Sequence, residues 1–506
     1  MHAAVQGFVK EQSMERKRSS GILMHISSLP GEYGIGDFGK EAYSFVDFLA
    51  DAKQKYWQVL PLGITGYGDS PYQSFSSYAG NPYFIELDEF IERGYLTKDE
   101  INSIDLGCDV TRVDYGLLYR NKMHLLEKAY EKAKEDLKED LYRFYWDNNE
   151  WLKEFALFMS IKKHHGNVSW LIWQEEYRRK DSKVVEKFEI ENIDRIYFWT
   201  FTQYFFYKQW YRLKSYANVK GVRIIGDLPI YVAEDSQDVW SNPRLFNLDE
   251  DLLPITVSGC PPDAFSRKGQ LWGNPIYNWS EMEKDNYRWW KNRIKHSFEI
   301  FDVLRIDHFR GFEAYWEIKY GFEDAVIGHW VKGPGTDFFN SIKEELGELN
   351  IIAEDLGFLT EDVKKLLKYS GFPGMKVLQF AFDSREESDY LPHNYDKNCV
   401  VYTGTHDNST VEGWFLNAGI EDVDYAKKYL KLDSKEGLNW GFIRGAWSSA
   451  AGLAITTMQD ILGLGDEARM NTPATVNGNW TWRMKKTDLT DEMINNLAAI
   501  TAIYRR

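Results

Sequence analysis

The sequence has few cysteines and no long apolar stretch. Cys108, Cys260 and Cys399 are the only cysteines in 506 residues, and they are far apart with no CxxC pair. Such scarcity excludes both a disulfide framework and a cysteine zinc site, and it favours a cytoplasmic protein. No apolar run approaches the roughly 20 residues that a membrane-spanning helix requires, so we expect a soluble protein.

Positive charge is also scarce. Lys and Arg number 61 against 77 Asp and Glu, which gives a formal net charge of -16. No Lys/Arg cluster stands out, so nucleic acid and anionic membrane surfaces are poor candidate partners. Aromatic residues, by contrast, make up 16% of the chain. Most of them should form a core, but the apolar faces of sugar rings also stack on aromatic side chains, so a neutral carbohydrate is a suitable ligand.

Runs rich in β-branched residues alternate with helical patterns along the chain. Seven runs read as strands: 21–26, 56–62, 221–230, 303–309, 350–355, 375–382 and 399–407. Helical periodicity follows the first run at 41–52 and the fifth at 361–367. This alternation predicts parallel βαβ units. With an eighth strand placed near 457–464, the fold class is an α/β protein, a (β/α)8 TIM barrel.

Several segments lack the alternation of strand and helix patterns that predicts the barrel. Residues 1–18 read as an N-terminal extension without the apolar core of a signal peptide, and the barrel should occupy 19–500, with 501–506 as the C-terminal end. Amphipathic helical patterns fill 88–217, which predicts an inserted helical subdomain. The stretch 233–290 is rich in Pro, Gly, Asn and Trp, so we expect long ordered loops over the active site. No separate C-terminal β-domain is expected.

Three carboxylates stand at the ends of apolar runs: Asp307 in VLRIDHFRG, Glu354 in NIIAEDLG and Asp407 in VVYTGTHDN. A barrel enzyme keeps its chemistry at the carboxyl ends of its strands, and glycosidic bond chemistry requires a pair of acids there. Arg305 precedes Asp307 by two residues, points to the same face and should keep it ionised. Partial burial should raise the pKa of Glu354, as suits a general acid. Strand-end ion pairs, helix caps and turns are the structural alternatives.

Four of these segments together resemble the signature of one enzyme family. GDLPIYV (226–232), LRIDHFRG (304–311), IIAEDLG (351–357) and THDN (405–408) are similar to motifs of the 4-α-glucanotransferases, the amylomaltase or disproportionating-enzyme family of the α-amylase clan. Four further segments match in family order: 70–82, 259–275, 371–383 and 460–465. The resemblance therefore extends over nearly all of 19–500.

The resemblance implies a role for each matching residue. Asp307 corresponds to the nucleophile, Glu354 to the general acid/base and Asp407 to the transition-state stabiliser. The implied substrate-binding residues are Tyr72, Ser70, Asp227, Asp263, Phe265, Trp272, Arg305, His406 and Asn479. Among them, Tyr72 stacks on the donor sugar, and Asp263, Phe265 and Trp272 lie in a loop over the acceptor side. Two positions depart from the family pattern, Ala264 where an aromatic is frequent and Ala474 where Gly is common.

The implied activity is transfer of α-1,4-glucan segments to an acceptor glucan or glucose by a retaining double displacement. The partners would be maltooligosaccharides, amylose and fragments of starch or glycogen, with no cofactor and no metal. An α-glucan hydrolase of the same clan and a catalytically silent glucan-binding protein remain as alternatives. Metal-dependent phosphoester hydrolysis through His308, His406 and Asp407 is disfavoured.

Overall fold

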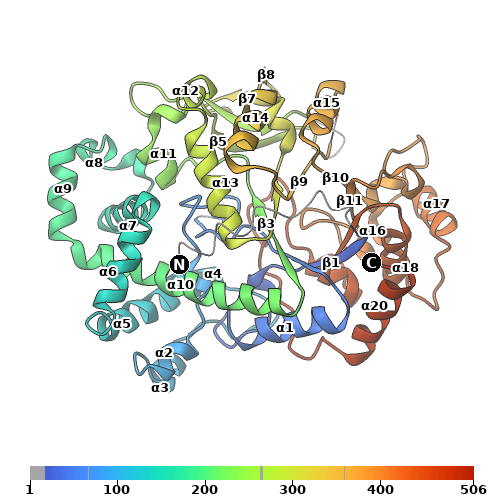
Figure 1. Cartoon of the computed structure of the whole chain (residues 1–506), viewed down its shortest axis with the longest axis horizontal. Helices are drawn as coiled ribbons and strands as arrows, with labels where there is room; N and C mark the ends of the chain where they lie inside the picture. Colours follow the sequence, from blue (N-terminus) through green and yellow to red (C-terminus); the bar gives the residue numbers. More distant parts are fainter. Residues whose placement is uncertain (1–16, 67, 263–265, 358) are drawn as a thin grey trace.

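A parallel β-barrel lies at the centre of the computed structural model, which describes residues 17–66, 68–262, 266–357 and 359–506 (Figure 1). The eight strands follow the order β10-β11-β12-β1-β2-β3-β6-β9. Their bounds are β1 Ser19–Leu23, β2 Tyr56–Gln58, β3 Arg223–Leu228, β6 Val303–Ile306, β9 Ile351–Ala353, β10 Gly374–Val377, β11 Cys399–Tyr402 and β12 Leu453–Thr457. The amide of Ala353 donates to the carbonyl of Pro373 at 2.9 Å, which brings β9 beside β10 and nearly closes the barrel. The predicted (β/α)8 fold is confirmed.

Seven of the eight strands lie where the apolar runs predicted them. The eighth prediction, near 457–464, was wrong. The strand there is β12, Leu453–Thr457, and the following Met458–Leu462 forms helix α19. Thr457 is the last strand residue and also the helix N-cap, since its side chain accepts the amide of Asp460 at 3.1 Å. A capped helix start just after a short strand explains the displaced prediction.

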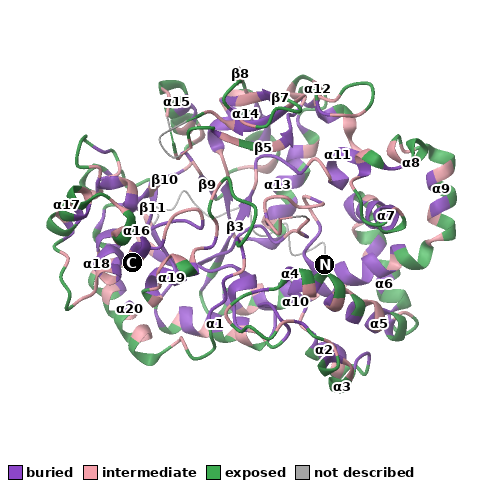
Figure 2. Ribbon diagram, turned by 180° about the vertical axis from the view of Figure 1, so that it is seen from behind, coloured by how far each residue is buried: buried purple, intermediate pink, exposed green. Residues whose placement is uncertain are grey.

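Helices surround the barrel (Figure 1). The predicted helices after the first and fifth strands are present as α1, Lys40–Asp51, and α15, Glu361–Ser370. The others outside the stretch between β2 and β3 are α11 Gln237–Ser241, α12 Trp279–Lys284, α13 Arg288–Ile300, α14 Gly335–Leu346, α16 Val411–Asn417, α17 Ile420–Leu430, α18 Leu438–Ser448 and α20 Asp491–Ile503. Figure 2 shows buried strands at the centre and exposed segments at the periphery.

A group of helices lies between β2 and β3, at the left of Figure 1. It contains α2 Asp88–Glu92, α3 Lys98–Asn102, α4 Tyr115–Leu117, α5 Met123–Ala133, α6 Lys138–Asp147, α7 Asn149–His164, α8 Glu175–Arg178, α9 Ser182–Glu191 and α10 Ile193–Val219. At 1.5 Å per residue α10 is roughly 40 Å long. It contacts α5, α6 and α7 as well as α1, α13 and β3. This helix therefore joins the group to the barrel wall; the boundaries 88–217 of a separate subdomain stay a prediction.

A second, antiparallel sheet was not predicted. Its order is β5-β4-β7-β8, with β4 Thr256–Cys260, β5 Gln270–Pro275, β7 Ala314–Lys319 and β8 His329–Lys332. The described part of 233–290 thus contains strands β4 and β5, helices α11 and α12 and the start of α13 in addition to the expected loops. The strands β4 and β5 are short and carry Gly, Asn and Pro without a clear alternation of apolar residues. Strand β4 pairs with β5 on one side and, on the other, with β7, which is distant along the chain.

Most of the largest aromatic residues belong to the core. Trp57, Trp170, Trp210, Trp240, Trp290 and Trp447 are all fully buried. Much of the aromatic excess is therefore structural. Across the described ranges, no helix combines the length and the apolar character needed to cross a membrane. Nor do the His, Cys, Asp and Glu side chains of these ranges form a group of three able to hold a metal ion.

Candidate active site

The three predicted acids lie at one rim of the barrel. Asp307 comes directly after β6, Glu354 directly after β9, and Asp407 in the turn after β11, and all three strands run in the same direction. Strands β6 and β9 are neighbours in the sheet. The amide of His308, next to Asp307, donates to Glu354 Oε2 at 2.6 Å, and the Leu356 amide donates to Oε1 at 2.9 Å. The carboxyl group of Glu354 therefore lies beside the peptide that follows Asp307.

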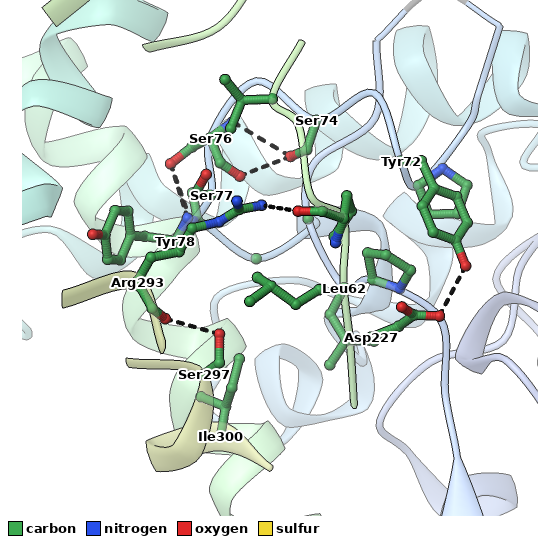
Figure 3. Close-up of a pocket in the computed structure, with 18 of the residues that line it drawn as sticks. Leu62, Tyr72, Ser74, Ser76, Ser77, Tyr78, Asp227, Arg293, Ser297 and Ile300 are labelled. Carbon is green, nitrogen blue, oxygen red and sulfur yellow. Dashed lines mark hydrogen bonds between the residues drawn. The ribbon is translucent and has the colours of Figure 1, made fainter. Parts of the chain in front are cut away.

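A buried ion-pair network orients Asp307. Arg305 Nη1 donates to Asp227 Oδ1 and Oδ2 at 2.7 and 2.6 Å, and its Nη2 donates to Asp307 Oδ1 at 3.0 Å. The side chains of Arg305 and Asp227 are only 4% and 0% exposed. The hydroxyl of Tyr72 donates to Asp227 Oδ2 at 2.9 Å, as Figure 3 shows. Because the guanidinium is planar and forked, it fixes both carboxylates at once.

Burial shifts the pKa values of Asp307 and Glu354 away from those of ordinary carboxylates. It raises the pKa of Asp307 to about 6, although the charge of Arg305 opposes the rise. Burial also raises the pKa of Glu354 to about 7; Arg305 opposes this rise, and the negative charge of Asp307 adds to it. At near-neutral pH, Asp307 is thus the more readily ionised acid and Glu354 the more readily protonated one. A nucleophile and a general acid require this order.

The third acid has the opposite character. Burial alone would raise the pKa of Asp407, but His406 and hydrogen bonds from His406 and Asn471 outweigh it and lower the pKa to about 2. His406 Nε2 lies 3.3 Å from Asp407 Oδ2, and Asn471 Nδ2 donates to Oδ1 at 2.6 Å. Asp407 therefore stays ionised throughout the neutral range. A fixed negative charge can stabilise a positively charged sugar transition state.

Aromatic rings lie beside these acids. The rings of Tyr72 and His406 are stacked with centroids 5.2 Å apart, and Trp480 lies 5.9 Å from each of them. Trp272, on β5, points its ring against His308 in an edge-to-face contact at 4.7 Å. The antiparallel sheet thus delivers one aromatic side chain to the rim of the barrel.

The remaining predicted residues differ in their placement. Ser70 Oγ accepts the amide of Tyr72 at 3.3 Å, so it shapes the turn that carries this ring. The amide group of Asn479 is engaged by its own loop, with Thr472 N, Thr475 O and Thr475 Oγ1 each at 3.0 Å. These bonds hold the loop 472–479 together, and the substrate-binding role of Asn479 stays a prediction. Asp263, Ala264 and Phe265 lie outside the described residues.

The sequence did not predict the roles of three residues that lie near the acids. The sequence suggested His308 only as a metal ligand in a disfavoured alternative, but this residue has a left-handed backbone with φ 50°, and burial lowers its pKa to about 3. Left-handed non-glycine residues are uncommon and concentrate at functional sites. Asn471 and Arg469 both bond to Asp407 from a loop more than 60 positions along the chain. No periodicity or strand end marks them in the sequence.

A cavity of about 60 Å³ lies behind Asp227 (Figure 3). Tyr72 and Asp227 form part of its lining, together with Ser77 and Arg293, while the three acids do not line it. The cavity adjoins the buried end of the ion-pair network.

Comparisons with known proteins place the chain in one family. A family model described as 4-alpha-glucanotransferase matches residues 24–490. The 4-alpha-glucanotransferase of Clostridium butyricum is 53% identical over 485 residues, 96% of this chain and 100% of the relative. The chloroplastic/amyloplastic enzyme of Solanum tuberosum is 43% identical, with 97% of this chain and 87% of the relative covered.

A solved structure gives the same result. The structure of amylomaltase from Streptococcus agalactiae in complex with acarbose has a TM-score of 0.94 and 46% identity to this chain, and the match covers 97% of this chain and 100% of the other. The family match, the full-length relatives and the shared architecture show that this chain belongs to the 4-α-glucanotransferase, or amylomaltase, family.

Proposed function

We propose that Asp307, Glu354 and Asp407 are the catalytic residues with which this 4-α-glucanotransferase carries out a retaining double displacement. The observation that carries the proposal is the hydrogen bond from the peptide after Asp307 to Glu354, next to the Arg305 contact with Asp307. These contacts place the carboxyl group of Glu354 beside the peptide that follows Asp307, at the carboxyl ends of neighbouring strands β6 and β9. Retaining enzymes use two carboxyl groups about 5 to 5.5 Å apart.

In the first displacement, Asp307 attacks the anomeric carbon of the donor glucan. The bond from this carbon to the bridging oxygen breaks, and Glu354 gives its proton to that oxygen, so the shortened glucan departs. Asp407 stabilises the positive charge that develops on the sugar ring. The product is a covalent glucosyl ester of Asp307.

In the second displacement, Glu354 acts as a base. It takes the proton from the 4-hydroxyl of an acceptor glucan, the oxygen attacks the anomeric carbon, and the ester bond to Asp307 breaks. Two inversions give net retention, and both acids return to their starting protonation states. Tyr72 and His406 are positioned to contact the donor sugar, and Trp272 the acceptor side.

Transfer requires an acceptor sugar to outcompete water at roughly 55 M. Positioning supplies effective molarities of 10⁵ M or more, so a well-held acceptor can react faster than water. We assign Trp272 to this task, because its ring covers His308 at the rim. The donors and acceptors we propose are α-1,4-glucans: maltooligosaccharides, amylose and fragments of starch or glycogen.

We also propose a cytoplasmic location. Cys108 and Cys399 form no disulfide, as suits a reducing compartment. The similar proteins include bacterial enzymes and a plant enzyme named as chloroplastic/amyloplastic.

The test is the product ladder formed from maltotriose. The wild-type enzyme should form glucose together with chains longer than maltotriose, whereas a hydrolase would form only shorter products. Asp307→Asn and Glu354→Gln should each lower the rate by about 10²–10⁴-fold or more. Glu361→Gln, an exposed acid on α15, is the matched control and should keep full activity.

A donor with a fluoride leaving group can distinguish the role of Asp307 from that of Glu354. Fluoride departs without a proton, so α-glucosyl fluoride should restore the first displacement in Glu354→Gln but not in Asp307→Asn. Equal rescue of both variants would refute the separate roles. A rate within tenfold of wild type in either variant would refute the catalytic assignment itself.

A further inference from the structure

The turn that carries His406 and Asp407 is fixed at both ends by one buried side chain. Asp460 Oδ2 accepts the hydroxyl of Thr403 at 2.6 Å, and its Oδ1 accepts the amide of Val411 at 2.7 Å. Asp460 is 1% exposed. The turn between these two residues is therefore anchored to helix α19, which follows the neighbouring strand β12.

Arg469 connects the middle of the same turn to the loop after α19. Its Nη2 donates to the carbonyl of Asp407 at 2.5 Å, its Nη1 to Ser409 Oγ at 3.3 Å, and its Nε to the carbonyl of Asn471 at 2.8 Å. One guanidinium thus bonds to both segments. Such a forked group fixes relative position better than a single donor.

Asn471 then contacts the carboxylate itself. Its backbone amide donates to the carbonyl of His406 at 3.0 Å, and its side-chain amide donates to Asp407 Oδ1 at 2.6 Å. The other oxygen of Asp407 faces His406 Nε2 at 3.3 Å. Each carboxylate oxygen has its own partner, so rotation of the carboxylate about its last bond is restricted.

We propose that Asn471 is a positioning residue for Asp407, and that Arg469 holds Asn471 in the place where it can act. The inference rests on the proposed catalytic role of Asp407. A carboxylate that stabilises transition-state charge must be aligned before the reaction, and misplacement by about 1 Å can cost roughly 10²-fold in rate. Asn471 touches Asp407 and not the reacting atoms, so its effect is exerted through that carboxylate.

The decisive variant is Asn471→Asp, which keeps the size of the side chain but replaces the donating amide by a carboxyl group. Ionised at pH 7, the new group repels Asp407, and kcat for maltotriose should fall by about 10–100-fold with KM changed less than about threefold. Protonated at lower pH, it regains a donor. The ratio of variant to wild-type kcat should therefore rise by at least about fivefold between pH 7 and pH 5.

Two further variants separate the loss of the hydrogen-bond donor at Asn471 from the effect of an added charge. Asn471→Ala has no donor at any pH, so its ratio to wild type should be low and constant. Asn477→Asp places the same charge on an exposed position of the same loop and should behave as wild type. The charged and titratable groups around Asp407 remain in all three variants, so their own titration is common to variant and wild type; they are His406, Arg305, Asp307, Tyr72 and Arg469.

A pH-independent ratio for Asn471→Asp, or a kcat for Asn471→Ala within twofold of wild type, would overturn the proposal. If Asn471→Asp does not fold, Arg469→Lys tests the proposal instead. We expect kcat to fall at least tenfold in this variant. An unchanged kcat would count against the proposal. Asp407→Asn is measured in the same series. If it is inactive while the Asn471 variants are normal, only the positioning inference fails; if it is active, the assigned role of Asp407 fails.

Discussion

Strands of the barrel and the edge strand β8 of the antiparallel sheet differ in how far they are buried. Every residue of β6 and β9 is buried, whereas three of the four residues of β8 are exposed. A strand buried on both faces holds the residue at its end in a fixed and partly buried position, where pKa values shift. From this sheet, Trp272 on β5 contacts His308 at the rim. Large catalytic effects should therefore come from the barrel and smaller ones from the sheet and loops.

Arg305→Lys should show the largest effect among the residues around the acids. An ammonium group cannot hold Asp227 with two bonds and Asp307 with a third, so we expect kcat for maltotriose to fall by about 100-fold. Arg223→Lys, at the exposed start of strand β3, is the matched barrel control and should keep full activity. A loss below threefold in Arg305→Lys would show that the buried network is dispensable.

The pH profile tests whether burial raises the pKa values of Asp307 and Glu354. Asp307 must be ionised and has a raised pKa of about 6, so kcat/KM should fall about tenfold per unit as the pH drops below about 6. Glu354 must be protonated and has a raised pKa of about 7, so the rate should fall similarly above about 7. An acid limb near 3.8, the ordinary Asp value, would indicate that Asp307 behaves like an exposed acid.

Trp272→Ala tests the contribution of the antiparallel sheet. Loss of the ring that covers His308 should admit water and loosen the acceptor, raising the ratio of hydrolysis to transfer by about three- to tenfold. Glucose release and chain lengthening from maltotriose are measured together. Trp330→Ala, a 42% exposed residue on the far strand β8, should leave the ratio unchanged. An equal rise in both variants would mean that the sheet acts through its stability alone.

Ala474→Gly should have the smallest effect, on stability alone. Ala474 stands where the family commonly has Gly and adopts φ 62°, a left-handed conformation that disfavours side chains. The substitution should raise the free energy of unfolding by about 0.5–1 kcal/mol, measured by urea denaturation. Ala499→Gly, inside helix α20, should lower it by about the same amount. Equal signs in the two variants would contradict strain at Ala474.

Prediction from sequence worked best where local pattern and chemistry agree. Seven barrel strands, the helices α1 and α15, and the strand-end positions of Asp307 and Glu354 follow from apolar runs that end in polar residues. Strand β12 was misplaced because it ends directly at a helix cap. The antiparallel sheet was missed because Gly, Asn and Pro obscure its short strands. The amide of Asn479 bonds within its own loop, a use that a sequence match does not reveal.

The sequence by itself determined that a (β/α)8 barrel would present acids at the carboxyl ends of its strands, since strand, helix and strand end are properties of neighbouring residues. Only the tertiary structure decided what surrounds those acids. Asp227 reaches Arg305 across 78 positions and Asn471 reaches Asp407 across 64. Burial and hydrogen bonding between such distant residues set the pKa and the orientation of each carboxylate, and neither exists until the chain has folded.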